Sequence, residues 1–316
     1  MQQTRIGVIG IGHLGKYHLQ KYQGIDECTI VGVADIVEDC TLAAAQRYGC
    51  SRHSDHRELI GKVDAVSIAV PTRAHFATAR DFLANGIDVL LEKPITQTLD
   101  QADELIRIAK DQGAVLQIGF VERFNPAVAT LAQFLERPLF IEAHRLHPFV
   151  IRGTDVDVIL DLMIHDLDII LHFVRSPVAR LDATGVSVLS DKVDIANARV
   201  TFENGCVANI TASRVTGKTM QKIRFFSDES YNSVNYAKRE LESFSRKIDS
   251  QGQPGIIKNS VNIEQYDALE AEIRAFVRSV RTRRQPAVTA EQGRESLALG
   301  LEISDTIREK LEKIRP

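Results

Sequence analysis

The stretch Arg5-Ile6-Gly7-Val8-Ile9-Gly10-Ile11-Gly12-His13-Leu14-Gly15 decides the fold of this chain. An apolar run leads directly into three glycines with the spacing G-x-G-x-x-G, and an amphipathic helix is predicted from His13 to Gln23. In such a turn the glycines allow the tight bend, the close approach of the backbone to a pyrophosphate, and the close packing of helix on strand. The helix N-terminus then offers its amides and its positive partial charge to phosphate groups. We therefore predict a dinucleotide site whose loop contacts are Gly10, Gly12, His13, Leu14 and Gly15.

Asp35 is the second part of this signal. It stands about 20 residues beyond the last glycine, at the end of the apolar run Thr29–Ala34. A carboxylate at this place accepts a hydrogen bond from the 2′-hydroxyl of a ribose and repels a 2′-phosphate, and Ile36 supplies no cation to offset the repulsion. The predicted cofactor is therefore NAD rather than NADP. A turn without a ligand, and a helix cap at Asp35, are the structural alternatives.

Apolar runs and helical segments alternate through the first 120 residues. Further runs are predicted over 65–70, 89–91 and 115–120, and helices over 38–48, 73–85 and 99–111. Runs that are apolar throughout are typical of parallel strands buried on both faces. The predicted fold class is α/β, with a doubly wound parallel Rossmann sheet in an NAD-binding domain of residues 1–121.

The pattern changes in residues 122–316. A long, mostly apolar helix is predicted over 155–174, and two alternating runs around Glu203-Asn204-Gly205 predict an antiparallel hairpin. Further elements are predicted as strands over 180–189 and 221–226, a mobile loop over 249–255, and helices over 266–281 and 290–314. Residues 122–316 are therefore predicted to form an α+β domain for substrate binding and oligomerisation, with a large open, mainly antiparallel sheet. Its C-terminal helices could pack back on the first domain.

The composition argues against several classes of protein. The 316 residues include 39 Lys plus Arg and 42 Asp plus Glu, so the formal charge of −3 argues against a nucleic-acid partner. No apolar run reaches the about 18 residues of a membrane-spanning helix, and the N-terminal residues lack the cleavage pattern of a signal peptide. The four cysteines have neither metal-type nor disulfide-type spacing. We expect a cytoplasmic protein with reduced thiols, no membrane association and no bound metal.

Glu92-Lys93-Pro94 follows a predicted strand that ends at Leu91. In open parallel sheets the ligand lies beyond the carboxyl ends of the strands. A lysine at that edge can hydrogen-bond a substrate hydroxyl and stabilise the alkoxide that forms as hydride leaves. Lys93 is thus a candidate catalytic residue, and a solvated surface lysine is the alternative.

Asp161, His165, Asp168 and His172 form a narrow ionisable stripe on the long predicted helix. Their spacing of i, i+4, i+7 and i+11 places them on one face, whereas most other residues of that helix are apolar. His165 could act as a general base, and Asp161 could orient it. A metal ion shared by these two residues stays open, as does a structural role, above all for Asp168 and His172. Asp166 points off the stripe, which predicts a structural role.

Five motifs, taken in order, resemble the Gfo/Idh/MocA oxidoreductase family over nearly the whole chain. They are Gly10–Gly15, Pro71-Thr72-x-x-His75, Glu92-Lys93-Pro94, Arg123-Phe124-x-Pro126, and Asp161-x-x-x-His165 followed by Asp168. The resemblance implies an oxidoreductase with a Rossmann domain and a second α/β domain. It also implies a catalytic group made of Lys93, Asp161 and His165. The family's cofactor contacts correspond here to Pro71, Thr72, His75, Glu92 and Lys93.

A narrower resemblance is to a subgroup of the family that oxidises the 3-hydroxyl of UDP-N-acetylglucosamine to a ketone, in the lipid A amino-sugar pathway. It rests on Glu122–Pro126, Glu142–Arg145 and Arg152–Val158. Because guanidinium groups bind phosphate oxygens in pairs, Arg123, Arg145 and Arg152 are candidates for the diphosphate, with ordinary surface charges as the alternative. The predicted substrate contacts are Lys93, Arg123, Asn125, Arg152, Asp161 and His165.

Two other functions are kept open. The first is the same chemistry on a free sugar, an inositol or another nucleotide sugar. The second, of another class, is a non-catalytic NAD-binding regulator, which Rossmann domains also support.

The second domain also predicts self-association. The face of its hairpin opposite the apolar one is mixed rather than highly charged: Asn197, Arg199, Thr201, Val207, Asn209, Thr211 and Ser213. Too little chain follows to cover a broad sheet on both sides, and an uncovered face of this kind is suited to a two-fold interface. We predict a homodimer, or a homotetramer built from dimers, and the family resemblance implies pairing through this sheet.

Overall fold

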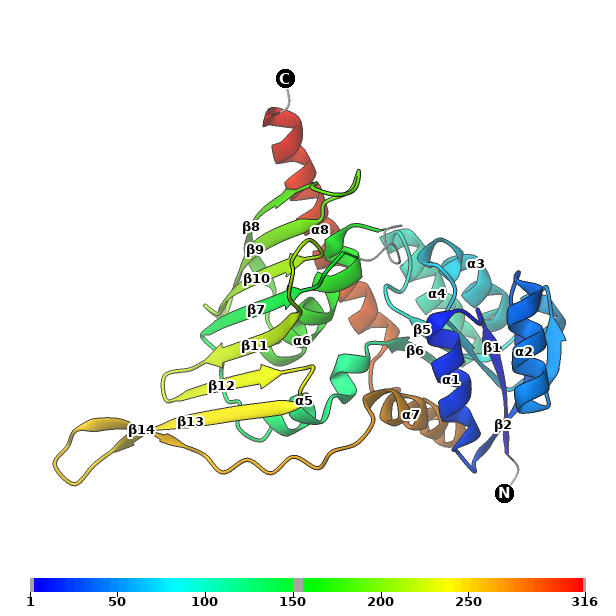
Figure 1. Cartoon of the computed structure of the whole chain (residues 1–316), viewed down its shortest axis with the longest axis horizontal. Coiled ribbons are helices and arrows are strands. Elements are labelled where there is room, and N and C mark those ends of the chain that lie inside the picture. The colour runs from blue at the N-terminus through cyan, green and yellow to red at the C-terminus, as the bar shows by residue number, and fades with distance from the viewer. Residues whose placement is uncertain (1–2, 150–155, 315–316) are drawn as a thin grey trace. The chain divides into compact units, whose positions relative to one another are not determined.

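The computed structural model describes residues 3–149 and 156–314, and the chain divides into two compact units (Figure 1). The first unit comprises Met1–Val121 and Asp267–Leu297, and the second comprises Glu122–Tyr266 and Ala298–Pro316. The first segment of the first unit ends at Val121, where the sequence analysis places the domain boundary. The sequence analysis includes Asp267–Leu297 in the second domain, whereas in the structure this segment belongs to the first unit.

The first unit is built on a six-stranded sheet in the order β3-β2-β1-β4-β5-β6. Every pair of neighbouring strands is parallel, which confirms the doubly wound Rossmann sheet. The strands are β1 (Thr4–Ile9), β2 (Cys28–Ala34), β3 (Ser51–His53), β4 (Ala65–Ile68), β5 (Asp88–Glu92) and β6 (Leu116–Gly119). The predicted apolar runs all correspond to strands. The sequence analysis missed β3, a polar three-residue edge strand without an apolar run.

Helices pack on this sheet because their apolar faces complement its buried strands. The helices are α1 (His13–Gln23), α2 (Glu38–Tyr48), α3 (Thr72–Leu83), α4 (Leu99–Gln112) and α7 (Ala268–Thr282), with a 3₁₀ turn at His56–Leu59. Ile273, Phe276 and Val277 of α7 join the core formed by β1 and α1. This burial explains why α7 belongs to the first unit. Helix α8 (Ala290–Ile314) begins in the first unit and continues in the second.

The second unit contains an eight-stranded sheet in the order β14-β13-β12-β11-β7-β10-β9-β8. Only the β7–β10 pair is parallel, so the sheet is mainly antiparallel, as predicted. The strands are β7 (Phe140–Leu146), β8 (Val178–Val186), β9 (Ile195–Phe202), β10 (Val207–Ser213), β11 (Met220–Phe226), β12 (Ser230–Asn235), β13 (Glu240–Ile248) and β14 (Pro254–Lys258). The predicted hairpin is β9–β10, and Gly205 takes a φ of +88° in its turn, a conformation that favours glycine.

The loop predicted over 249–255 is shorter than expected, because only residues 249–253 form a turn. Residues Pro254–Lys258 form strand β14, which pairs with β13 and leaves only a short turn between them. The Asp249 carboxylate accepts hydrogen bonds from the amides of Gln251 and Gln253, both at 2.8 Å, and so fixes this turn. The glycines and proline that suggested a loop lie in the turn and at the start of an edge strand, where proline is tolerated.

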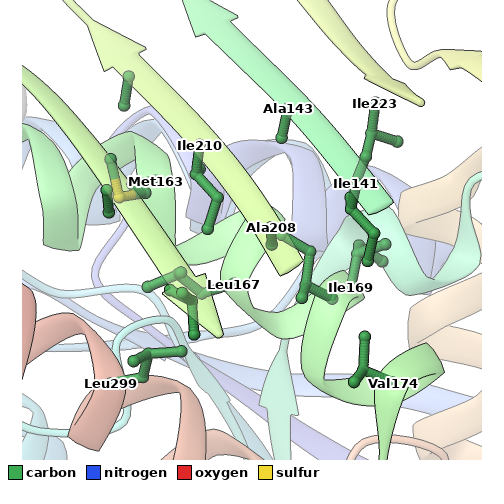
Figure 2. Close-up of a cluster of buried hydrophobic side chains, with 14 of the residues drawn as sticks. Ile141, Ala143, Met163, Leu167, Ile169, Val174, Ala208, Ile210, Ile223 and Leu299 are labelled. Atoms are coloured by element: carbon green, nitrogen blue, oxygen red, sulfur yellow. The ribbon is translucent and has the colours of Figure 1, made fainter. Parts of the chain in front are cut away.

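The long helix predicted over 155–174 has two parts. A π-helical turn, Ile159–Met163, precedes helix α6 (Ile164–Val174), and residue 155 lies outside the described part of the chain. Figure 2 shows side chains of the sheet, such as Ile141 and Ile210, facing Leu167 and Ile169 of α6 across the core. The helix is therefore held by the apolar face of the sheet, and α5 (Pro126–Leu131) adds to the same core.

The opposite face of the second sheet is more charged than the hairpin alone suggests. Register places Asp182, Arg199, Asn209, Glu142 and Arg224 side by side on five neighbouring strands. Arg224 and Glu142 form an ion pair at 2.8 Å, and Arg199 donates to Asn209 at 2.9 Å. The sequence analysis described this face as mixed rather than highly charged because it considered only β9 and β10.

Among the described residues, no helix is long and apolar enough to cross a membrane.

Candidate active site

The glycine loop between β1 and α1 has the geometry that its spacing predicts. Gly10 has a φ of +84°, and a Cβ there would lie 2.7 Å from the Ala69 carbonyl oxygen. A Cβ on Gly15 would lie 1.9 Å from the Gly10 carbonyl oxygen, so glycine is needed for the close packing of α1 on the loop. A Cβ on Gly12, by contrast, would meet no heavy atom of the described residues within 4 Å. Space is therefore open at the position where a pyrophosphate would approach the backbone.

Helix α1 starts at His13, and its N-cap is Gly12, which has no side chain to cap the first amides. Those amides therefore stay available to an anion. His13 and Leu14 are exposed on the first turn, and the His13 ring packs edge-on against Tyr17 at 5.1 Å. Because both side chains are exposed to solvent, we expect His13 and Leu14 to contact the cofactor through their backbone amides.

Asp35 follows β2 and is joined to the glycine loop. Its carboxylate accepts a hydrogen bond from the Ile11 amide at 2.5 Å and another from the Val37 amide at 2.8 Å. A carboxylate offers about four lone-pair sites, so two of them remain for ribose hydroxyls. The open space at Gly12, the uncapped start of α1 and this acidic group together fit an NAD molecule.

Pro71 and Thr72 open helix α3, and His75 lies one turn further on. The His75 side chain is 1% exposed, and its ring nitrogens lie 2.8 Å from the Pro94 carbonyl oxygen and 2.9 Å from the Val70 carbonyl oxygen. Burial lowers the pKa of His75, although both carbonyl groups oppose that shift. The ring thus lies between two carbonyl oxygens of the first unit, and a neutral imidazole donates its single N–H to one of them. The predicted contact of His75 with the cofactor stays a prediction.

Glu92 and Lys93 stand at the carboxyl end of β5, and the Lys93–Pro94 peptide is cis. The Glu92 carboxylate turns inward, 3.0 Å from His18 Nε2, and the residue is 8% exposed. Glu92 therefore supports the strand end from within through its carboxylate, and its predicted contact with the cofactor stays a prediction. Lys93 is half-buried and stands beyond the strand, at the edge where open parallel sheets bind ligands.

Asp161 and His165 lie in the second unit, where the π-helical turn passes into α6. Both side chains are half-buried, in contrast to the buried residues around them. A single π-helical turn inside a helix is frequent at functional sites, because it re-aims the side chains that follow. The arrangement keeps a carboxylate and an imidazole partly accessible to solvent.

His147 is a neighbour of Asp161 that the sequence analysis missed. It follows β7, is half-buried, and its Nε2 lies 2.5 Å from Nε2 of Gln221. Burial and the nearby Arg145 lower the pKa of His147, and the charge of Asp161 opposes the shift. In the sequence, Ile141 and Ala143 alternate with Glu142 and His144, and this pattern could have placed His147 at the end of a strand.

Asp168 and His172 form a separate cluster with Arg123. Arg123 donates to both carboxylate oxygens of Asp168, at 2.6 and 2.9 Å, and its Nη1 lies 2.6 Å from His172 Nδ1. The side chains of Arg123 and Asp168 are 8% and 1% exposed. Burial and the Arg123 charge lower the pKa of His172 to about 4. Arg123 is therefore engaged inside the protein, which does not fit its predicted contact with substrate.

Arg145 and Asn125 are engaged in the same way. Arg145 pairs with Asp166 at 2.8 Å and with Glu122 at 3.1 Å, and it stacks 4.7 Å from the centre of the Tyr236 ring. Asn125 is 4% exposed, and its side chain caps α5 and donates to the Tyr236 carbonyl oxygen. Neither side chain is free for a diphosphate or a sugar, and the predicted substrate contact at Arg152 lies outside the described residues.

Among residues 3–149 and 156–314, no group of three or more His, Cys, Asp or Glu side chains is arranged to hold a metal ion. Lys93 in the first unit and Asp161, His165 and His147 in the second are half-buried, so each is partly accessible to a ligand.

The comparisons with known proteins agree with this arrangement. Residues 4–120 match the family described as "Oxidoreductase family, NAD-binding Rossmann fold", and residues 140–230 match the "GFO/IDH/MocA C-terminal domain". A UDP-N-acetylglucosamine 3-dehydrogenase from Acidithiobacillus ferrooxidans is 37% identical over 99% of this chain and 100% of its own. A crystal form of an enzyme of that name from the same organism superposes with a TM-score of 0.91 at 38% identity, covering 97% of this chain and 98% of the other. A myo-inositol 2-dehydrogenase from Thermotoga maritima is 28% identical over 97% of both chains.

Proposed function

This chain belongs to the Gfo/Idh/MocA family of NAD-binding oxidoreductases, and we propose that it oxidises the 3-hydroxyl of UDP-N-acetylglucosamine to a ketone. The observation that carries the proposal is full-length similarity to an enzyme named for that reaction, at 37% identity. The similarity extends over both units, so it includes the residues of the Rossmann loop and those of the second sheet.

The proposed reaction uses three side chains of this chain. His165 takes the proton of the sugar hydroxyl, and Asp161, four residues earlier, orients the imidazole for that transfer. Lys93 donates a hydrogen bond to the same oxygen and stabilises its developing negative charge as the carbon–oxygen double bond forms. Bound NAD supplies the acceptor for the hydride that leaves the carbon.

Binding of the cofactor follows from the first unit. The amides at the start of α1 and the open space at Gly12 receive the pyrophosphate, and Asp35 accepts from the ribose. Lys93 stands at the carboxyl edge of the same sheet and would face the nicotinamide end. The side chains of Glu92 and His75 hold the segments around Lys93.

Recognition of the nucleotide does not involve Arg123 or Arg145 in this proposal, because both pair with buried carboxylates. Breaking such a pair would leave a charge buried without its partner, at a cost of about 3–5 kcal/mol. The diphosphate is therefore bound by other groups, and Arg152 is the arginine that remains from the sequence analysis.

A second candidate is an inositol or free-sugar dehydrogenase with the same three catalytic residues. It is favoured by the similarity to the Thermotoga maritima enzyme, which extends over 97% of both chains at 28% identity. The two candidates differ in substrate only, since both need NAD, a base and a lysine.

A direct assay separates them. Purified protein is incubated with NAD and, in parallel, with UDP-N-acetylglucosamine, UDP-N-acetylgalactosamine, UDP-glucose and myo-inositol, and NADH formation is followed by its absorbance. We expect turnover with UDP-N-acetylglucosamine and a product that mass spectrometry shows to be lighter by two hydrogens. Turnover with myo-inositol alone would favour the second candidate, and NAD binding without any turnover would favour a regulator.

The proposal includes a cytoplasmic enzyme that assembles as a homodimer or a homotetramer through the charged face of the second sheet. All four cysteines are free, which suits a reducing compartment. The face carries the half-buried residues Val207, Asn209 and Thr211, and these would be covered in a two-fold interface.

A further inference from the structure

Glu272 is a buried acidic residue that the proposed reaction does not use. It lies on α7, in the first unit, and its exposed fraction is 0%. Neither oxygen of its carboxyl group has a hydrogen-bond partner among the described residues. A carboxylate in such a place would lose its hydration without compensation, which costs several kcal/mol. The side chain therefore calls for an explanation.

A second buried carboxyl group, that of Glu92, acts electrostatically on Glu272. A Cβ on Gly119 would lie 3.1 Å from the Glu92 carboxylate, so this carboxylate lies over β6 at Gly119. Gln117, two residues earlier on β6, points to the same face of the sheet and donates to the Glu272 carbonyl oxygen at 3.2 Å. The two acids thus share one side of β6, under helices α1 and α7, which pack next to each other (Figure 1).

Within the described part of the chain, the carboxyl group of Glu92 has a basic hydrogen-bond partner and that of Glu272 has none. His18 lies between Glu92 and Ser67, with Nε2 3.0 Å from Glu92 Oε1 and Nδ1 3.1 Å from Ser67 Oγ. Tyr22 extends this chain to Ser67 Oγ at 2.9 Å. His18, Ser67 and Tyr22 are all buried. The hydrogen bonds of the cluster therefore reach the carboxyl group of Glu92 and not that of Glu272.

The surroundings of Glu272 raise the pKa of its carboxyl group. Burial raises its pKa well above the usual value, and the charge of Glu92 raises it further. Around the cluster, the titratable groups are His18 and Tyr22 on α1, Glu92 and Lys93 at the end of β5, and His75 on α3, whose pKa responds to both Glu92 and Lys93. Of these groups, His18 hydrogen-bonds Glu92 and Lys93 follows Glu92 in the chain, and neither is hydrogen-bonded to the carboxyl group of Glu272.

We propose that Glu272 is a protonated carboxylic acid at neutral pH and a positioning residue, which packs against the Glu92–His18 pair and so holds the strand end that carries Lys93. As a neutral group it fills the space behind Glu92 without adding a second buried anion. Ionisation of Glu272 would place two negative charges in one buried space and push the end of β5 away from α7. The positioning role rests on the proposed function, whereas the protonation state does not.

The protonation state is tested by the pH dependence of stability. Glu272→Gln keeps the shape of the neutral acid and removes its proton. The unfolded wild type releases that proton above the usual carboxyl pKa, whereas the folded wild type retains it, so wild-type stability falls as pH rises toward the folded pKa. The folding equilibrium constant of E272Q relative to wild type should therefore rise about tenfold per pH unit from pH 5 to pH 7.

Glu270→Gln is the matched control, because Glu270 lies on the same helix, pairs with Arg274 and is 39% exposed at its side chain. Its folding constant relative to wild type should not rise with pH. A ratio for E272Q that stays constant, or falls as pH rises, would show that Glu272 is ionised in the folded protein and would overturn the proposal.

The positioning role is tested by turnover. Glu272→Leu keeps the volume but removes the polar group, and we expect kcat to fall roughly tenfold while KM and NAD affinity change less than about twofold. E272Q should restore kcat to nearly the wild-type value. A wild-type kcat in E272L would refute the positioning role. If the wild type turns over no sugar or nucleotide sugar, the proposed function fails, and the stability measurement still decides the protonation state of Glu272.

Discussion

Asp35 accepts a hydrogen bond from the Ile11 amide at 2.5 Å, which joins the acid after β2 to the glycine loop after β1. The second hydrogen bond, from Val37, holds the other carboxylate oxygen. The negative charge is thus fixed beside the loop that would bind the pyrophosphate. A cofactor that carries a phosphate on its ribose would meet this charge directly.

We expect NAD to bind at least about tenfold tighter than NADP, a difference of about 1.4 kcal/mol. Asp35→Asn removes the charge with little change of shape and should reduce this preference, chiefly by weakening repulsion of the 2′-phosphate. Calorimetric titration of both cofactors measures the ratio. Asp39→Asn, an exposed neighbour on α2, is the control and should leave the ratio unchanged. Equal or tighter binding of NADP by the wild type would contradict the role of Asp35.

Lys93→Ala and His165→Ala should each lower kcat by roughly a hundredfold or more, while the affinity for NAD changes only a few-fold. The reason is that both side chains act on the reacting hydroxyl rather than on the phosphates. Steady-state kinetics at saturating substrate, together with NAD titration, separates the two effects. Lys110→Ala, an exposed lysine on α4, should change neither quantity. Near-normal turnover in either variant would mean that its role is wrongly assigned.

If Asp161 and His165 bound a metal ion, a chelator would lower turnover in the same assay. Chelation should leave wild-type turnover unchanged, because the proposed reaction uses His165 as a base. A loss of activity on chelation that added Zn²⁺ restores would favour the metal-binding alternative.

His172 makes stability depend on pH. Its folded pKa is about 4, lowered by burial and by Arg123 from the usual 6.5. The unfolded state therefore binds a proton between these two values while the folded state does not, so stability falls as pH drops from 6.5 toward 4. Denaturant unfolding across this range should show a smaller fall for His172→Gln than for the wild type. His13→Gln, an exposed histidine, is the control and should follow the wild type. The same slope in H172Q and wild type would contradict this account.

The second sheet should mediate self-association. Val207→Asp and Thr211→Asp each add a negative charge on β10. In the wild type, Thr211 accepts a hydrogen bond from Asn197 at 2.9 Å. Both should weaken assembly before they affect NAD binding, since they lie in the second unit. Light scattering at micromolar concentration gives the mass. A wild-type monomer of 35.2 kDa would rule out the interface.

Much of the fold could be predicted from local patterns. The glycine spacing, Asp35 and the apolar runs predicted the parallel sheet because each depends on residues that are neighbours along the chain. The Asn-Gly turn predicted the β9–β10 hairpin for the same reason. Five strands were missed, namely β3, β7, β12, β13 and β14. Of these, β3 and β14 lie at sheet edges, which bury few side chains and therefore carry a weak apolar pattern.

The sequence by itself determined the family, the cofactor loop and the candidate residues Lys93, Asp161 and His165, since these rest on motifs of fixed spacing. Only the tertiary structure decided which polar residues are engaged inside the protein. Arg123, Arg145 and Glu92 looked like ligand contacts, but Asp168, Asp166 and His18 pair with them across distances of 45, 21 and 74 residues along the chain. A charged side chain is the same in sequence whether it faces a ligand or a buried partner. Its burial and its partner, which decide the energy of its charge, exist only once the chain has folded.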